Sequence, residues 1–324
     1  MSKRRLTEQQ RRRISRNQTQ HLDLEGCHDG IIVRHFGREV IVEDAAGALH
    51  ECKLRQNLGE IACGDRVSFL PQQDTEHGVV VAMQARENML ERIGFGGRPK
   101  SVAANLDQVL IVCAIRPEPN HYLIDRYIVA TRNLPATPVL VINKTDLDSD
   151  DGDAVATKLH NIYGQIDLEI IRTSTKTGEG IDALRQQLAA HTSIFVGLSG
   201  VGKSSLVNCI LPEVDARVGD ISAASQEGTH TTTVSSLYRI PTGGYLIDSP
   251  GVRDFSPVIT TREQVLRGFS ELHRHLGECK FNDCSHTNEP GCAIQATIGS
   301  GEIIEQRLKS YQHMLEEIVT GESG

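Results

Sequence analysis

Gly197-Leu198-Ser199-Gly200-Val201-Gly202-Lys203-Ser204 lies between the apolar run Ile194-Phe195-Val196 and the segment Ser205-Leu206-Val207-Asn208-Cys209-Ile210. The stretch fits G-x-x-x-x-G-K-[ST], the phosphate-binding loop. The run before it has strand character, and the segment after it reads as the first turns of a helix. In that setting backbone N–H groups and the positive end of a helix dipole surround phosphate oxygens. The stretch therefore predicts a nucleoside triphosphate site, with contacts from Gly197 through Ser205.

Three further features supply the expected catalytic groups. Lys203 should reach the β- and γ-phosphates, and Ser204 should hold a magnesium ion. Asp248 ends the apolar run Tyr245-Leu246-Ile247, where it can bind magnesium through water, and the Gly251 amide can contact the γ-phosphate. A threonine of Gly228-Thr229-His230-Thr231-Thr232-Thr233 should also ligate magnesium, and spacing does not choose between Thr232 and Thr233.

The base expected at this site is guanine. Asn143-Lys144-Thr145-Asp146 ends the apolar run Pro138–Ile142 and fits N-K-x-D. A carboxylate at Asp146 can accept from both guanine N1–H and N2–H, Asn143 can reach the base or brace the loop, and the Lys144 stem can cover the ring. Ser174, in Thr173-Ser174-Thr175-Lys176, fits the loop whose backbone amide reads guanine O6. The cofactor pair expected is thus GTP and GDP.

Strands and helices alternate around these motifs, which predicts an α/β domain with a mostly parallel sheet over residues 99–256. Strands are expected at 109–115, 138–142, 168–171 and 194–196, and helices near 154–163 and 180–190. The base-reading motifs precede the phosphate loop, whereas in ordinary small GTPases they follow it. The order therefore predicts a circularly permuted P-loop GTPase domain.

The N-terminal third differs in character. Short strand-like runs separated by turn signals predict an OB-fold-like β-barrel of about five strands over residues 28–90. The barrel could bind oligonucleotides or be purely structural. Residues 1–27 form an arm whose first 16 residues hold seven Lys or Arg against one Glu. Such an arm could bind phosphate backbones or be a solvated tail. Residues 85–105 read as a linker.

The C-terminal segment 257–324 carries a metal motif. Cys279, Cys284, His286 and Cys292 supply three thiolates and an imidazole, enough for a closed tetrahedral zinc site, which predicts one structural zinc ion. Apolar residues then recur at helical spacing, which predicts a terminal amphipathic helix that packs internally; they are Ile304, Leu308, Tyr311, Leu315 and Ile318.

Composition limits the class of protein. The net charge of −8 argues against a generally basic nucleic-acid binder. No apolar run approaches the roughly 20 residues that span a bilayer, and the basic N-terminus lacks the apolar stretch of a secretory signal. Five of the cysteines are scattered singly, as in a reducing cytosol. We therefore expect a cytoplasmic protein without a membrane partner.

The chain resembles the ribosome small-subunit-dependent GTPase family, also called RsgA or YjeQ. The features that carry this resemblance are the barrel, the permuted G-domain, the His-Thr-Thr-Thr run and the cysteine-rich tail. The resemblance covers nearly the whole chain, including Ala103-Ala104-Asn105-Leu106-Asp107-Gln108. It implies a GTPase, expected to be monomeric, that docks on the rRNA and proteins of the small ribosomal subunit late in its maturation, near the decoding region. It also implies that the subunit stimulates hydrolysis.

Val252 follows Gly251, where Ras-like enzymes have a glutamine that orients the attacking water. Valine cannot do this, so the isolated enzyme should be slow. His230 is the nearest candidate to position water, or else it is a structural switch residue. The alternative function is a nucleotide-switched RNA-binding scaffold in which hydrolysis is incidental.

Overall fold

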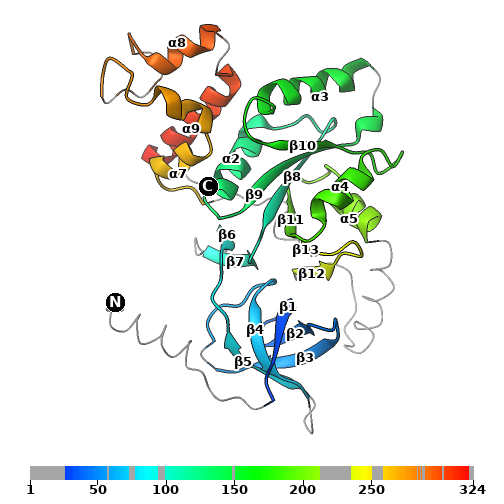
Figure 1. The fold of residues 1–324 in the computed structure, drawn as a ribbon. Helices are drawn as coiled ribbons and strands as arrows, with labels where there is room; N and C mark the ends of the chain where they lie inside the picture. The colour runs from blue at the N-terminus through cyan, green and yellow to red at the C-terminus, as the bar shows by residue number, and fades with distance from the viewer. Residues whose placement is uncertain are drawn as a thin grey trace.

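The computed structural model describes residues 26–56, 58–72, 77–93, 99–147, 150–211, 235–249, 258–282, 284, 286, 289–300 and 303–320. Three regions follow one another along the chain: a barrel at the bottom of Figure 1, a central α/β domain, and a small helical domain beside helix α2. No helix among these residues is both long and apolar enough to cross a membrane.

The central domain is a sheet covered by helices on both faces. Its strands are β8 (Gln108–Ala114), β9 (Thr137–Asn143), β10 (Glu169–Arg172), β11 (Thr192–Val196), β12 (Ser236–Arg239) and β13 (Tyr245–Asp248). Its helices are α2 (His121–Arg132), η1 (Thr145–Leu147), α3 (Asp150–Tyr163), α4 (Ile181–Leu188) and α5 (Lys203–Ile210). The four strands expected from sequence are confirmed.

Alternation along β8 explains the two helical layers. Val109, Ile111 and Cys113 join a buried cluster with residues of α2 and α3. Leu110, Val112 and Ala114 join a different cluster with residues of α4 and α5. Successive side chains of a strand point to opposite faces, so β8, which is buried throughout and apolar from Val109 to Ala114, fills both faces of the sheet at once.

Strand order places the motif loops at one edge. The order is β10-β9-β8-β11-β13-β12, and every pair from β10 to β13 is parallel. The carboxyl ends of parallel strands meet at one edge of the sheet, which is where α/β proteins bind ligands. The phosphate loop follows β11, the N-K-x-D loop follows β9, and the Ser174 loop follows β10. The fold thus gathers motifs that lie up to about 60 residues apart in sequence.

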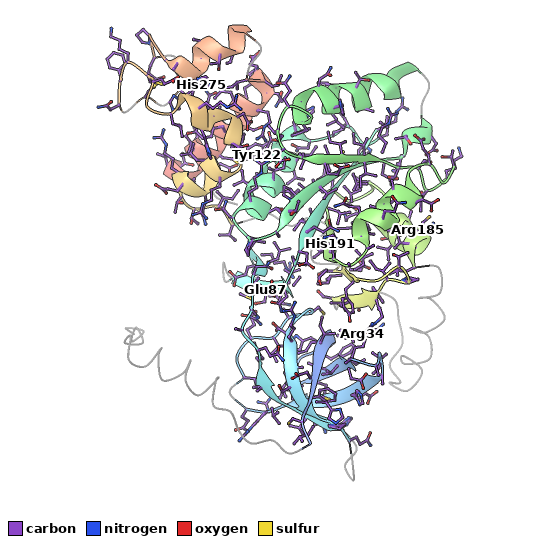
Figure 2. The ribbon with its side chains drawn as sticks, viewed as in Figure 1. Arg34, Glu87, Tyr122, Arg185, His191 and His275 are labelled. Carbon is purple, nitrogen blue, oxygen red and sulfur yellow. The ribbon has the colours of Figure 1, made fainter. Side chains whose placement is uncertain are left out.

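The N-terminal barrel has the five strands expected of it. They are β1 (His28–Phe36), β2 (Glu39–Asp44), β3 (Leu49–Leu54), β4 (Arg66–Leu70) and β5 (Gly78–Met83). Pairing of β1 with β4 closes the barrel around a core that includes Ile32 and Phe69. The barrel strand β1 also pairs with β12 through Arg34 and Ser236, at the junction marked by Arg34 in Figure 2. Barrel and G-domain therefore share one continuous sheet.

The expected linker is wrong where the chain forms a hairpin. Strands β6 (Met89–Ile93) and β7 (Pro99–Ala104) pair antiparallel. Asn105 donates a side-chain hydrogen bond of 2.8 Å to the Gly64 carbonyl, and the Ala104 amide donates to the Cys63 carbonyl at 2.9 Å. The segment between the two domains is therefore fixed against the barrel.

The C-terminal domain packs on α2 around a buried charge. Its elements are α7 (Arg262–Arg267), η3 (Ser270–His275), α8 (Ala293–Ser300) and α9 (Glu305–Thr320). Arg307 of α9 is 1% exposed, and it donates to Asp125 of α2 at 2.5 Å and to Glu271 at 2.8 Å. Its guanidinium lies 4.2 Å from the centre of the Phe269 ring. Figure 2 shows Tyr122 of α2 at this boundary.

Candidate functional site

The phosphate loop has the backbone that its glycines predict. Gly197, Gly200 and Gly202 have φ values of 137°, 80° and 98°. A Cβ at Gly197 would lie 2.1 Å from the Val112 carbonyl oxygen, and one at Gly202 would lie 2.4 Å from the Asn143 side-chain nitrogen. Only glycine fits at positions 197 and 202, because the positive φ and the close neighbours both exclude a side chain, whereas at Gly200 the positive φ alone favours glycine.

Lys203 begins α5 and folds back over this loop. Its Nζ donates to the carbonyls of Gly197 and Leu198 at 2.6 and 2.7 Å. Ser204 and Ser205 follow in the first turn and are exposed, as are Ser199 and Gly200 at the tip of the loop. The ammonium group is thus held beside the phosphate loop at the N-terminus of α5, a position suited to anionic oxygens.

The N-K-x-D loop braces the phosphate loop from the side. Asn143 is fully buried, and its amide donates to the Val201 carbonyl at 2.9 Å. Lys144 donates to the carbonyls of Gly200 and Arg116 at 2.5 and 3.1 Å. Of the two roles open to Asn143, bracing the loop is the one that its contacts support.

Asp146 lies at the rim with its carboxylate oriented by neighbours. Ser174 donates to its Oδ1 at 2.7 Å, and Lys176 Nζ lies 3.7 Å from its Oδ2. The Ser174 hydrogen bond lowers the pKa of Asp146, and Lys176 adds to the effect. An ionised carboxylate with an oriented second oxygen is the acceptor pair that guanine N1–H and N2–H require.

Sequence reasoning missed two supports of this rim. Thr173 is fully buried and donates to Asn143 Oδ1 at 3.1 Å, and Glu179 accepts from Thr145 Oγ1 at 3.0 Å. Thr173 precedes Ser174 in the quoted motif, so its place was visible there. Glu179 lies in a glycine-rich turn, and no pattern marks it.

Asp248, the acidic magnesium ligand expected from sequence, lies among the described residues. It ends β13, which pairs in parallel with β11, the strand that leads into the phosphate loop. Ser204 and Asp248 thus follow neighbouring parallel strands, as a hydroxyl and a carboxylate that share one hard cation would require. His230, Thr232, Thr233, Gly251 and Val252 lie outside the described residues, as do residues 1–25 of the basic arm.

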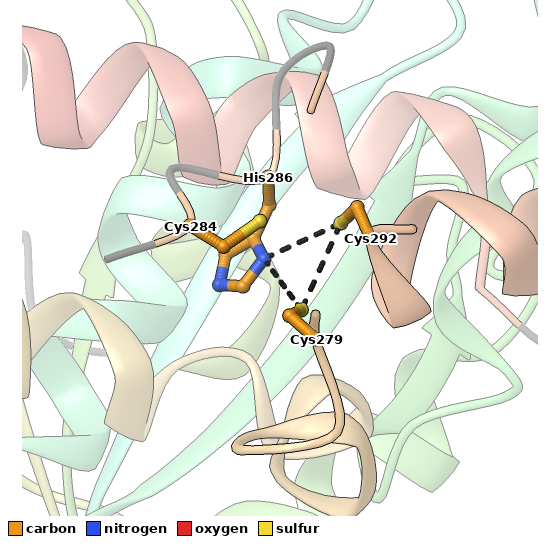
Figure 3. A group of neighbouring side chains, drawn as sticks. All are labelled: Cys279, Cys284, His286 and Cys292. Atoms are coloured by element: carbon orange, nitrogen blue, oxygen red, sulfur yellow. Dashed lines mark hydrogen bonds between the residues drawn. The ribbon is translucent and has the colours of Figure 1, made fainter. Parts of the chain in front are cut away.

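The cysteine cluster has the geometry of a zinc site. Cys279, Cys284, His286 and Cys292 have ligand atoms that all lie within 4.8 Å of one another. His286 Nδ1 lies 3.5 Å from both Cys279 Sγ and Cys292 Sγ, and those two sulfurs are 3.9 Å apart (Figure 3). Tetrahedral zinc with Zn–S of about 2.3 Å and Zn–N of about 2.0–2.1 Å gives separations of about 3.5 and 3.8 Å. The four residues therefore fit Zn²⁺.

Groups around the cluster orient its ligands. The His286 carbonyl accepts from Gln295 at 2.7 Å and also from Gln312 of α9. Burial lowers the pKa of His286, which keeps its imidazole neutral, as a metal ligand must be. The backbone N–H of Gln295, near the start of α8, donates to Cys292 Sγ at 3.4 Å. The cluster thus connects the segment that follows η3 with α8 and α9.

A permuted parallel sheet, a phosphate loop and a rim that carries the N-K-x-D carboxylate are the features of a circularly permuted GTPase. Comparison with known proteins agrees. The chain belongs to the RsgA GTPase family, whose model matches residues 83–257. The small ribosomal subunit biogenesis GTPase RsgA of Chromohalobacter salexigens is 43% identical over 99% of this chain and 100% of its own. That of Hahella chejuensis is 40% identical over 98% of this chain and 97% of its own.

Two solved structures share the fold. YjeQ from Thermotoga maritima superposes with a TM-score of 0.73 at 35% identity, covering 90% of this chain and 99% of that one. YloQ, described as a circularly permuted GTPase, superposes with a TM-score of 0.69 at 24% identity, covering 94% of this chain and 99% of that one. The permuted GTPase fold expected from motif order is confirmed.

Proposed function

We propose that this GTPase hydrolyses GTP to GDP and phosphate while docked on the small ribosomal subunit, and thereby assists late maturation of that subunit. The observation that carries the proposal is the convergence of Lys203, Asp146 and Ser174 at one edge of a sheet. Relatives matched over almost their whole length are named as small-subunit biogenesis GTPases, which supports the choice of partner.

In the proposed reaction, water attacks the γ-phosphate. Lys203 and the amides of the loop from Gly197 to Ser205 stabilise the charge on the phosphate oxygens. Ser204, Asp248 and Thr232 would hold Mg²⁺, which supplies charge neutralisation at the β- and γ-oxygens. The Gly251 amide would contact the γ-phosphate.

On the base, Asp146 would accept from N1–H and N2–H. The Ser174 amide is bonded to the Glu179 carbonyl at 2.9 Å, and the amides of Lys176 and Thr177 are bonded to Ser174 Oγ at 3.2 Å. We therefore assign the O6 contact to the amide of Thr175 and give Ser174 the task of orienting Asp146.

We place the protein in the cytoplasm as a monomer with four parts: residues 1–27, 28–90, 99–256 and 257–324. One structural zinc ion would hold the last part together. Scattered free cysteines and a ribosomal partner support this location. The basic arm would contact rRNA phosphates, since it concentrates positive charge on a chain of net charge −8.

Val252 favours a second candidate function, a nucleotide-switched RNA-binding scaffold. Without a glutamine after Gly251, the site lacks the side chain that orients water in Ras-like enzymes. In the favoured account, docking places His230 where it can orient the attacking water, and this completes the site. In the scaffold account, docking depends on the bound nucleotide and turnover is incidental.

Two variants separate docking from chemistry. Deleting residues 1–16 is expected to weaken binding to small subunits and flatten its salt dependence, because up to about seven phosphate contacts are lost. Unstimulated turnover should not change. His230→Ala should do the reverse, so that docking persists while stimulated turnover falls. Cosedimentation across a salt series and phosphate release measure both. If His230→Ala is stimulated as strongly as the parent, His230 has no catalytic role.

A further inference from the structure

The side chain of Thr145 joins the two loops that are expected to read the base. Thr145 is 5% exposed and lies between Lys144 and Asp146. Its Oγ1 lies 3.1 Å from the Thr173 carbonyl and 3.0 Å from Glu179 Oε2. One hydroxyl proton serves two acceptors here, and the carboxylate is the charged, stronger one.

The backbone fixes Glu179 in this position. It lies between Gly178 and Gly180, whose φ values are 84° and 68°. A Cβ at Gly180 would lie 1.7 Å from the Arg172 carbonyl oxygen, so the turn cannot shift to accept a side chain there. The Glu179 carbonyl accepts from the Ser174 amide at 2.9 Å, and its own amide donates to Thr177 Oγ1 at 3.3 Å.

We propose that Glu179 is a positioning residue for guanine recognition, holding the Asn143–Asp146 loop against the Ser174 loop through Thr145. This inference rests on the proposed function, which places guanine between those loops. Glu179 meets both sides of the base site, since its carbonyl holds Ser174 and its carboxylate holds Thr145. Two contacts then fix the position of Asp146. Ser174 donates a hydrogen bond to its carboxylate, and Thr145 holds the backbone immediately before it.

The position of Glu179 determines which step it affects. The phosphate side of the site is braced separately, by Asn143 on Val201 and by Lys144 on Gly200. Loss of the Glu179 carboxylate leaves the Asn143 and Lys144 contacts with the phosphate loop intact, but it removes the contact that holds Thr145. Nucleotide should therefore leave faster, while the rate of the chemical step on bound GTP stays the same.

The test is the rate at which a fluorescent GDP analogue dissociates from the purified full-length protein with magnesium. Glu179→Ala is expected to raise this rate about three- to tenfold. Glu179→Gln keeps an acceptor oxygen and should recover most of the parent's slow dissociation. Thr145→Val should match Glu179→Ala, and the double variant should be no faster than the faster single one. Single-turnover hydrolysis of bound GTP should be unchanged in the two Glu179 variants.

Asp182→Ala is the matched control, because this exposed carboxylate lies on α4 and pairs with Arg185 of the same helix. Both acids are exposed, so melting temperatures should agree and folding will not confuse the comparison. The proposal is overturned if Glu179→Ala releases nucleotide at the parent's rate, or if the effects of the two single variants simply add. Failure of the guanine site is a different result: the parent itself would then bind GDP no better than ADP.

Discussion

Asp146→Asn is expected to prefer xanthine nucleotides, whereas the parent protein is expected to prefer guanine nucleotides. Asp146 is ionised at neutral pH, since the Ser174 hydrogen bond lowers its pKa, and its side chain is only 9% exposed. An asparagine keeps one acceptor oxygen for N1–H but presents an N–H₂ group to the guanine amine. Donor then faces donor in a partly buried site, which should cost about 10²- to 10³-fold in GDP affinity. Xanthine carries a carbonyl at that position and restores the pair.

Competition between GDP and XDP for the purified protein measures the exchange. Asp182→Asn, at an exposed carboxylate on the neighbouring helix α4, is the control and should keep the parent's guanine preference. Unchanged GDP preference in Asp146→Asn would remove Asp146 from the base site.

Cys284→Ser is expected to release zinc and unfold the segment around residues 279–292. The sulfur and nitrogen separations match tetrahedral zinc, and the helices η3, α8 and α9 meet at the cluster. Binding energy at such a site is folding energy, about 10 kcal/mol or more for small zinc domains. The G-domain has its own core, so GDP affinity should largely survive.

Metal analysis, limited proteolysis and GDP binding on the same preparations separate these effects. Cys27→Ser changes a cysteine outside the cluster and should retain the parent's metal content. Pure parent protein without zinc would show the assignment to be wrong, and full zinc in Cys284→Ser would show that Cys284 is not a ligand.

The fold of the G-domain could be predicted from the sequence because its nucleotide-binding motifs have strict chemical requirements. The phosphate loop, Asp146 and Ser174 each need particular residue types at fixed spacing, and their order along the chain revealed the permutation before any strand was paired. The zinc cluster was predictable for the same reason, because three thiolates and an imidazole lie close in sequence. Strand periodicity also gave the five-stranded barrel.

Contacts between domains were not predictable. Arg307 looks like an ordinary charge on an amphipathic helix, and its partners Asp125 and Glu271 lie 182 and 36 residues away. The continuous sheet depends on one pairing, Arg34 with Ser236, which leaves no periodic signal. The segment that contains β6 and β7 reads as a linker in the sequence because it includes Gly94-Phe95-Gly96-Gly97. Glu179 was missed because a glutamate in a turn is usually just solvated.

Small ribosomal subunits are expected to turn on GTP hydrolysis at this site. Phosphate release by the parent protein, with and without purified small subunits, tests it most directly, and large subunits serve as the control. We predict slow turnover alone, an increase of about tenfold or more with small subunits, and no increase with large ones. Equal rates in all three mixtures, with nucleotide-dependent docking intact, would contradict the claim and establish the scaffold instead.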